Sequence, residues 1–308
     1  MKISQPMNVA GFYRQSDGQW QTALVLTDGV DVLETSMSTL TDAPQRQPAN
    51  LAGIEAALGQ TIDVAPEEIA NRCACPVVSD FRSSDMEMGG QGTPLHPFYL
   101  HALSRMTHQP RPLVYLLVED AVSLVWVDPR VKDPTNPNAL VSFDTGPAFG
   151  PLKGLAQPNK AGQVVDGALE LFLDDPYFRR LPPKRVEPSN FGPLLELVAE
   201  LSPEDARATI LGMAATSVLL AQEHLPSPPA KVVVLGQGAK SALFTKLLKA
   251  ALDVPIETPN TEEYDPATIN AQAIAYLAAR AARGLPTTAP HTTGVAAAVG
   301  GGTITDSA

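Results

Sequence analysis

The first forty residues alternate short apolar, β-branched runs with turn residues. Residues 7–15 and 20–28 each predict a β-strand, and the Asp17-Gly18 pair between them is a typical hairpin turn. Residues 30–37 predict a third strand. The chain is therefore expected to begin with an antiparallel sheet.

The following segment changes pattern. Residues 51–74 predict one or two short helices, and residues 76–80 predict a short buried strand that ends at Asp80. In open α/β sheets, ligands bind beyond the carboxyl ends of strands. Asp80 is therefore placed where chemistry is expected.

The second half of the chain repeats this plan. Strands are predicted at residues 112–120, 121–129 and 139–144, and a strand, glycine turn and helix at 230–252. Two long helices are predicted as well. One is capped by Ser202 with Pro203 at its first position, and the other runs from Asp265-Pro266 to Gly284.

These elements predict an α/β protein built from two duplicated lobes with a central cleft between them. The N-terminal lobe is expected to span residues 1–109 and to carry the loop after Asp80. The C-terminal lobe is expected to span residues 110–308, with its last segment, 285–308, packing back on the N-terminal lobe.

Composition and charge exclude several classes of protein. The 308 residues are 44% hydrophobic, enough for a large folded core, and the net charge of -11 disfavours nucleic-acid binding. No apolar run is long enough to predict a membrane span or signal peptide, so a cytoplasmic location is expected. The two cysteines, with no histidine beside them, do not predict a metal site.

Several motifs together resemble one enzyme family. They are "SDFRSSDMEMGGQGTPLHPF" from Ser79, "FDTGP" from Phe143, "DPYFRRLPPK" from Asp175 and the closing "TTGV" and "GGGTI". In order and spacing they are similar to the anhydro-N-acetylmuramic acid kinases, members of the sugar kinase, actin and Hsp70 superfamily. The resemblance implies a ribonuclease H-like (actin-like ATPase) fold.

The resemblance also implies a reaction in peptidoglycan recycling. ATP with Mg²⁺ would phosphorylate 1,6-anhydro-N-acetylmuramic acid while water opens its anhydro bridge, and a carboxylate must accept the proton of that water. By its position in the motif, Asp80 matches the catalytic aspartate. The implied partners are this sugar and ATP, with a homodimer compatible with the family.

Substrate-binding residues are implied in the same loop and in the last helix. Arg82 and Asp85 are expected to orient Asp80 or contact the sugar. The glycines of "GGQG" are expected to leave N–H groups free for an anion. The implied substrate-binding residues are Arg82, Asp85, Gly90, Gln91 and Asn270. Asn270 stands where the family has a glutamate.

The expected nucleotide-binding turns depart from the family pattern. Ser16, Asp17 and Gly18 remain in the first hairpin, but larger residues precede them. In the second hairpin, Glu119 and Asp120 replace two glycines and bring negative charge toward the expected triphosphate.

Other nucleotide-binding residues are retained. In the third turn, "GQGAKS", a glutamine replaces one glycine, while Gly236 and Gly238 remain. The turn of "FDTGP" keeps its three expected nucleotide-binding residues, Asp144, Thr145 and Gly146, although an ordinary strand-ending turn is an alternative explanation.

Two functions therefore remain open from the sequence. The first is an active anhydro-sugar kinase that uses ATP with Mg²⁺. The alternative is an inactive relative without a cofactor, which keeps the fold as a sugar-binding, regulatory or scaffolding protein because its phosphate-binding turns are altered. A kinase for a different anhydro-sugar would also fit the change at Asn270.

Overall fold

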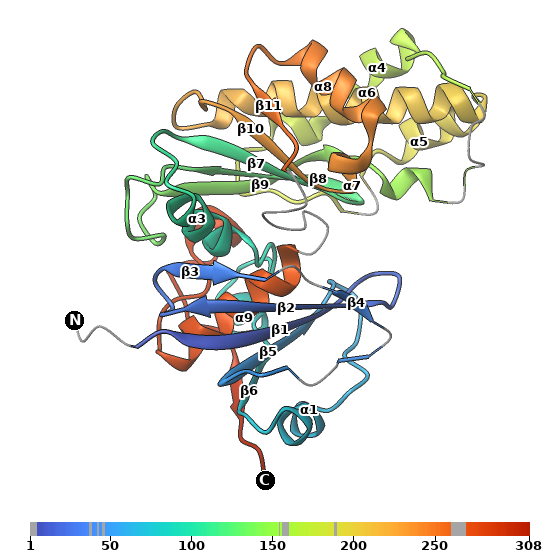
Figure 1. Ribbon diagram of the computed structural model, residues 1–308. Helices are drawn as coiled ribbons and strands as arrows, with labels where there is room; N and C mark the ends of the chain where they lie inside the picture. Colours follow the sequence, from blue (N-terminus) through green and yellow to red (C-terminus); the bar gives the residue numbers. More distant parts are fainter. Residues whose placement is uncertain are drawn as a thin grey trace. The chain divides into compact units, whose positions relative to one another are not determined.

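The computed structural model describes most of the chain. The described residues are 5–36, 39–41, 43–44, 47–153, 155, 160–187, 190–259 and 269–308, without the side chains of 39, 40, 193, 194 and 197. They form two compact α/β units (Figure 1). Among them, no helix combines the length and the apolar character that a membrane span requires.

The boundaries of the two units follow the predicted lobes only in part. Unit 1 contains residues 1–111, 127–141 and 260–308, and unit 2 contains 112–126 and 142–259. The last long helix was expected in the C-terminal lobe, but it belongs to unit 1. The prediction had only residues 285–308 packing on the N-terminal lobe, whereas unit 1 already includes the chain from residue 260.

The sheet of unit 1 has the strand order β12-β6-β5-β1-β2-β3, with β4 paired to β2. Its strands are β1 (Met7–Arg14), β2 (Trp20–Thr27), β3 (Val32–Thr35), β4 (Thr39–Thr41), β5 (Leu51–Ala56), β6 (Val77–Ser79) and β12 (Thr303–Thr305). Strands β1, β2 and β3 are antiparallel, whereas β5 runs parallel to β1 and β6 parallel to β5. The predicted hairpin and third strand are confirmed.

The prediction of helix across residues 51–74 is wrong for its first part. Leu51–Ala56 is a fully buried strand, and only Pro66–Cys73 (α1) is helical. The sequence LAGIEA has small residues with little strand propensity, so its conformation depends on partners distant in sequence. Those partners are β1 on one side and β6 on the other.

Helix α9 (Ile269–Ala282) packs on β1, β2 and β5 (Figure 1). Small residues allow the close approach: a Cβ at Gly11 would lie 1.8 Å from the carbonyl oxygen of Ala271. The helix ends as predicted at Gly284, which adopts a left-handed φ of 64°. Its predicted start at Asp265-Pro266 lies outside the described residues. The other helices of unit 1 are α2 (Ser83–Glu87), α3 (Pro97–Met106) and α10 (Pro290–Thr293).

The sheet of unit 2 has the order β11-β10-β7-β8-β9. Its strands are β7 (Leu113–Val118), β8 (Ala121–Val127), β9 (Leu140–Pro147), β10 (Val232–Gly236) and β11 (Ile256–Glu257). In each sheet the first strand is central, with the second and third strands on one side and two later, parallel strands on the other. Unit 1 adds β12 beyond these two, antiparallel to β6. The expected duplicated, ribonuclease H-like α/β fold is confirmed.

Helices of unit 2 include the long apolar helix α6 (Pro203–Ala221), which contacts α8 (Ala242–Ala251). The predicted cap is confirmed, because the Ser202 hydroxyl accepts the N–H of Asp205 at 3.2 Å. The remaining helices are α4 (Asp166–Leu173), α5 (Gly192–Ala199), α7 (Gln237–Lys240) and the short 3-10 helices Gly150–Leu152, Pro176–Arg179 and Gln222–His224.

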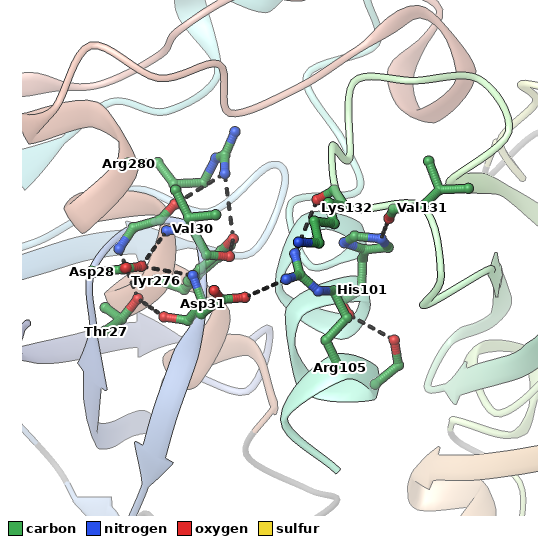
Figure 2. Close-up of polar contacts among 12 residues, drawn as sticks. Thr27, Asp28, Val30, Asp31, His101, Arg105, Val131, Lys132, Tyr276 and Arg280 are labelled. Atoms are coloured by element: carbon green, nitrogen blue, oxygen red, sulfur yellow. Dashed lines mark hydrogen bonds and ion pairs between the residues drawn. The ribbon is translucent and has the colours of Figure 1, made fainter. Parts of the chain in front are cut away.

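A polar network in unit 1 ties α9 and α3 to the turn between β2 and β3 (Figure 2). Arg280, 3% exposed, donates to the carbonyls of Gly29 and Pro286, and its guanidinium lies 5.1 Å from the centre of the Phe98 ring. From α3, Arg105 forms an ion pair with Asp31 at 2.8 Å. Helix α3 follows the "GGQG" loop, so this network anchors the segment that carries the loop.

Replacing Arg280 with methionine is expected to lower the free energy of unfolding by about 3 kcal/mol. The change leaves the buried carbonyl of Gly29 and the half-buried carbonyl of Pro286 without their donor, and it removes the cation from the aromatic ring. Urea unfolding followed by circular dichroism measures the loss. Arg111→Met, at an exposed position, serves as the control and is expected to change stability by less than about 0.5 kcal/mol. An equal effect of the two changes would contradict this role of Arg280.

Candidate active site

Asp80 directly follows β6 and has a strained backbone conformation. Its φ is +58°, in the left-handed region, which non-glycine residues adopt rarely and at a cost of about 1–3 kcal/mol. The side chain is exposed, and its Oδ1 accepts the Ser83 hydroxyl at 2.7 Å and the Ser83 N–H at 3.2 Å. Since Ser83 contacts only Oδ1 here, Oδ2 is the oxygen best placed to accept a proton from water.

Asp85 is buried and bridges the "GGQG" loop to the C-terminal segment of unit 1. Its Oδ1 accepts the Gly92 N–H at 2.8 Å, and its Oδ2 accepts the hydroxyls of Thr288 at 2.6 Å and Thr293 at 2.5 Å. Gly90 lies so close that a Cβ there would be 2.0 Å from Oδ1. This geometry supports the loop's structure rather than contact between the Asp85 carboxylate and a sugar.

The expectation that the "GGQG" loop offers free N–H groups is wrong. The N–H of Gly89 donates to Met86 O, that of Gly90 to Asp85 O, that of Gln91 to Thr293 O and that of Gly92 to the Asp85 carboxylate. The anion that the loop surrounds is therefore an internal side chain. Gly89 and Gly92 still need glycine's freedom, because their φ values are +84° and +67°.

Arg82 is held by protein groups and does not contact Asp80. Its guanidinium donates to the carbonyls of Gly92 and Ala56, and its Nε lies 3.8 Å from Glu55 Oε1. Glu55, 7% exposed, also accepts the N–H of Phe81 at 3.1 Å. Arg82 and Glu55 thus fix the backbone on the carboxyl side of Asp80. Glu55 was not predicted as a site residue, because its strand was predicted as helix.

Ser16, Asp17 and Gly18 form the β1–β2 turn in unit 1. The N–H of Gly18 donates to Gln15 O, and the Asp17 carboxylate accepts the Gln19 N–H at 3.0 Å. The N–H groups of Ser16 and Asp17 have no hydrogen-bond partner among the described residues, and both residues are exposed. Two donors of this turn therefore stay available to an anionic ligand.

Arg14, one of the large residues before this turn, points away from it. Arg14 donates to the Thr61 carbonyl at 2.6 Å and pairs with Asp63 at 3.1 Å. Its side chain is therefore directed toward the segment that follows β5. A Cβ on Gly18 would still be 3.9 Å from the guanidinium, so the arginine leaves space at the turn.

In unit 2, Glu119 lies against the glycine turn after β10. Its Oε2 accepts the side-chain amide of Gln237 at 3.0 Å, and a Cβ on Gly236 would be 2.4 Å from Oε1. Gly236 has a φ of +69°, and a Cβ on Gly238 would lie 2.6 Å from Val118 Cβ. Both retained glycines are thus required by backbone geometry and close packing. The Glu119 carboxylate takes up space beside them.

Burial raises the pKa of Glu119 from about 4.5 to about 7, and the charge of Asp120 adds to this rise. The two hydrogen bonds from Gln237 and the charge of Lys240 act in the opposite direction. At neutral pH the side chain is therefore divided between its neutral and charged forms, so the repulsion of a triphosphate is weaker than from a fully ionised pair.

Replacing Glu119 with glutamine is expected to change how stability depends on pH. Because the folded-state pKa is raised, the wild-type free energy of unfolding should fall as the pH rises from about 4.5 to about 7. Allowing for partial solvent screening, Glu119 accounts for roughly 2 kcal/mol of this fall in the free energy of unfolding. Urea unfolding at a series of pH values should show this decline in the wild type and a flatter profile in Glu119→Gln. Identical profiles would exclude the raised pKa.

The three predicted residues of "FDTGP" lie in β9 and face different surroundings. Asp144 Oδ2 accepts the N–H of Val186 at 3.1 Å, and burial raises its pKa to about 6. The Thr145 hydroxyl is buried and bonded to that of Ser217 on α6 at 2.8 Å, and a Cβ on Gly146 would lie 2.9 Å from Ser217. Packing against α6 explains Thr145 and Gly146, so only their backbone groups remain for a ligand.

Asn270 is the second residue of α9 and is half-buried.

The predicted site residues fall into groups that belong to different units. Asp80, Arg82, Asp85, Gly90 and Gln91 lie in one segment of unit 1 that runs from the end of β6 through α2 and the loop after it, whereas Gly236 and Gly238 lie at the β10–α7 junction of unit 2. Within the described residues, no three acidic, histidine or cysteine side chains gather as a metal cage. Mg²⁺ does not require one, because it commonly binds through substrate phosphates, water and one or two carboxylates.

Solved structures with a similar course of the chain share little sequence with it. The activator of the 2-hydroxyisocaproyl-CoA dehydratase from Clostridium difficile has 12% identity and a TM-score of 0.42, covering 90% of this chain and 96% of that one. A ROK family glucokinase from Streptomyces griseus has 14% identity and a TM-score of 0.37, covering 88% of this chain and 99% of that one.

Sequence relatives are much closer. The family model for anhydro-N-acetylmuramic acid kinase matches residues 53–307. The anhydro-N-acetylmuramic acid kinase of Ruegeria sp. (strain TM1040) is 40% identical, covering 95% of this chain and 82% of the relative. That of Cereibacter sphaeroides is 36% identical, covering 94% of this chain and 83% of the relative. The chain belongs to the anhydro-N-acetylmuramic acid kinase family.

Proposed function

We propose that this protein is an ATP-dependent kinase that opens 1,6-anhydro-N-acetylmuramic acid with water and phosphorylates it at the 6-oxygen. The observation that carries the proposal is Asp80, an exposed carboxylate on a strained backbone directly after a sheet strand. Strained backbone conformations cluster at functional sites. Family membership supplies the substrate class.

In the proposed reaction, Asp80 acts as general base. It takes a proton from water while the water oxygen bonds to the anomeric carbon of the sugar. The bond from that carbon to the bridging oxygen breaks, and the released 6-oxygen accepts the γ-phosphoryl group of ATP, leaving ADP. Ser83 orients the carboxylate through Oδ1, and Glu55 and Arg82 hold the adjoining backbone.

The expected nucleotide-binding turns of the two units differ in what each offers to ATP. In the β1–β2 turn, the N–H groups of Ser16 and Asp17 are free of hydrogen bonds to described residues. In unit 2, Gly236 and Gly238 are the retained glycines of the third turn, and Asp144 belongs to the retained "FDTGP" motif. Mg²⁺ would neutralise charge on the phosphates when bound. The homodimer and the cytoplasmic location stay predictions.

The altered nucleotide-binding turns favour an inactive relative, and the second of them brings the strongest negative charge. Glu119 is bonded to Gln237 and has a pKa near neutrality, so it is a weaker obstacle to a phosphate than a free carboxylate. The comparisons add no support for an inactive protein. An active kinase is therefore the better-supported function.

Mass spectrometry of the sugar product tests the proposal. After incubation with Mg-ATP, the proposed reaction yields a sugar that has gained one phosphate group and one water. A product that has gained the phosphate alone would contradict the hydrolytic opening. Phosphorylation of other anhydro-sugars, with no reaction of the muramic sugar, would instead identify a kinase of different specificity.

A further inference from the structure

Two exposed methionines lie on the segment that leads into the "GGQG" loop. Met86 on α2 is 51% exposed, and Met88, directly after this helix, is 42% exposed. Of the other methionines that the structure describes, Met7 and Met106 are half-buried and Met213 is buried. Because oxidation of a side-chain sulfur follows its exposure, an oxidant reaches Met86 and Met88 more readily than these three.

The Met86 side chain covers Gly92, the last residue of the loop. A Cβ on Gly92 would lie 2.9 Å from both Cγ and Sδ of Met86, so the thioether rests against the Gly92 Cα. The N–H of Gly92 donates to the buried Asp85 carboxylate at 2.8 Å, and its carbonyl accepts the Arg82 guanidinium. Met86 therefore packs on the residue that joins these two side chains.

Met86 is also connected to Asp80 through α2. Its N–H donates to the Arg82 carbonyl at 3.0 Å. One helical turn earlier, Ser83 donates its hydroxyl and its N–H to the Asp80 carboxylate. A displacement of Met86 thus acts on the residues that hold Asp80 and its neighbouring backbone.

Met88 takes part in the loop through its backbone. Its N–H donates to the carbonyls of Ser84 and Asp85, and its carbonyl accepts the Ala296 N–H at 3.3 Å. Oxidation of a thioether leaves these backbone groups unchanged. Met88 is therefore a matched comparison for Met86.

The cysteines of the chain are protected from mild oxidants. Cys73 and Cys75 are both buried. Their mutual hydrogen bond, together with burial, raises the pKa of the Cys75 thiol. Because the thiolate is the reactive form of cysteine, a buried and protonated thiol reacts slowly.

We propose that Met86 is a modification site, at which a peroxide oxidises the thioether to the sulfoxide, loosens the "GGQG" loop at Gly92 and lowers sugar turnover. A sulfur lone pair attacks one oxygen of hydrogen peroxide, so an S–O bond forms and the O–O bond breaks. The other oxygen leaves as water after taking the proton of the transferred oxygen. The sulfur is oxidised and the peroxide is reduced.

The change in polarity explains the expected effect of this oxidation. A sulfoxide is polar and larger than a thioether, so water solvates it better than the contact with Gly92 does. The side chain then no longer covers Gly92. The effect on turnover rests on the proposed function, since it acts through Asp80.

Treatment of the full chain with hydrogen peroxide tests the proposal. Peptide mass spectrometry measures the gain of one oxygen at each methionine, and sugar-dependent ADP release is assayed on the same samples. Met86 is expected to be oxidised at least about tenfold faster than Met213. Complete oxidation of Met86 should lower kcat by about tenfold, because small displacements of catalytic groups cost this much or more. Methionine sulfoxide reductases with a thiol reductant should restore kcat.

Two variants assign the effect to one sulfur. Met86→Leu keeps the apolar volume without sulfur, so its untreated kcat should stay within about twofold of wild type and should resist peroxide. Met88→Leu should stay as sensitive as wild type. The proposal is overturned if Met86 is oxidised no faster than Met213, if kcat is unchanged once Met86 is oxidised, or if Met86→Leu loses as much activity as wild type.

Thermal unfolding separates failure of this proposal from failure of the proposed function. Peroxide treatment should lower the unfolding midpoint of wild type by about 2–4 °C and that of Met86→Leu by less than about 1 °C. If the untreated protein releases no ADP, the proposed function fails, and this difference alone decides whether oxidation at Met86 loosens the loop. Equal shifts in the two proteins would contradict the proposal whether or not the protein is active.

Discussion

Replacing Asp80 with asparagine is expected to lower sugar-dependent turnover by about a thousandfold, the usual contribution of a general base. Asparagine cannot accept the proton of the attacking water, but its side-chain oxygen can still accept the Ser83 hydroxyl. It also tolerates the left-handed backbone of this position better than most residues. The midpoint of thermal unfolding should therefore stay within about 1 °C of wild type.

Steady-state assays at saturating sugar and ATP measure the effect on kcat. Ser83→Ala provides the comparison, since it removes one hydrogen bond to Asp80 and keeps the carboxylate. It should lower kcat far less, by about tenfold at most. A kcat for Asp80→Asn within tenfold of wild type would exclude Asp80 as the base and direct attention to another carboxylate.

The second large effect is expected at Asp85, and it concerns stability. Asp85→Ala leaves the hydroxyls of Thr288 and Thr293 and the N–H of Gly92 buried without their acceptor. The expected loss is about 4 kcal/mol in the free energy of unfolding, or roughly 10 °C in the unfolding midpoint. The loop that follows Asp80 would lose its connection to the C-terminal segment.

Thermal unfolding monitored by circular dichroism measures this loss. Glu87→Ala is the matched control, because Glu87 lies on the same helix, α2, with an exposed side chain. The control should shift the midpoint by no more than about 2 °C. If Asp85→Ala unfolds like the control but no longer turns over sugar, Asp85 contacts substrate and the structural role assigned to it is wrong.

The parts of the fold that could be predicted from sequence have strong local signals. The first hairpin follows from the Asp17-Gly18 turn between two apolar runs, and α6 follows from the Ser202 cap with Pro203 at its first position. Strand β5 could not be predicted, because its small residues adopt a strand only through pairing with β1 and packing under α9. Because β5 was predicted as helix, the role of Glu55 beside Asp80 was not predicted either.

The sequence predicted where the candidate site lies along the chain, but not which contacts its side chains make. The motif located Asp80 at the end of β6, which the structure confirms. It could not show that Asp85 accepts a loop N–H and two distant hydroxyls, since Thr288 and Thr293 follow some two hundred residues later. Nor could the turn sequences show that Glu119 bonds to Gln237 from another strand end. Such contacts depend on tertiary packing rather than local pattern.

The kinase function is tested most directly by ADP release from Mg-ATP by the purified protein, in the presence and absence of 1,6-anhydro-N-acetylmuramic acid. We expect ADP release that depends on the sugar and saturates with its concentration. Absence of sugar-dependent release at high ATP concentration would contradict the kinase function. The chain would then be an inactive member of its family, with Asp80 retained by descent.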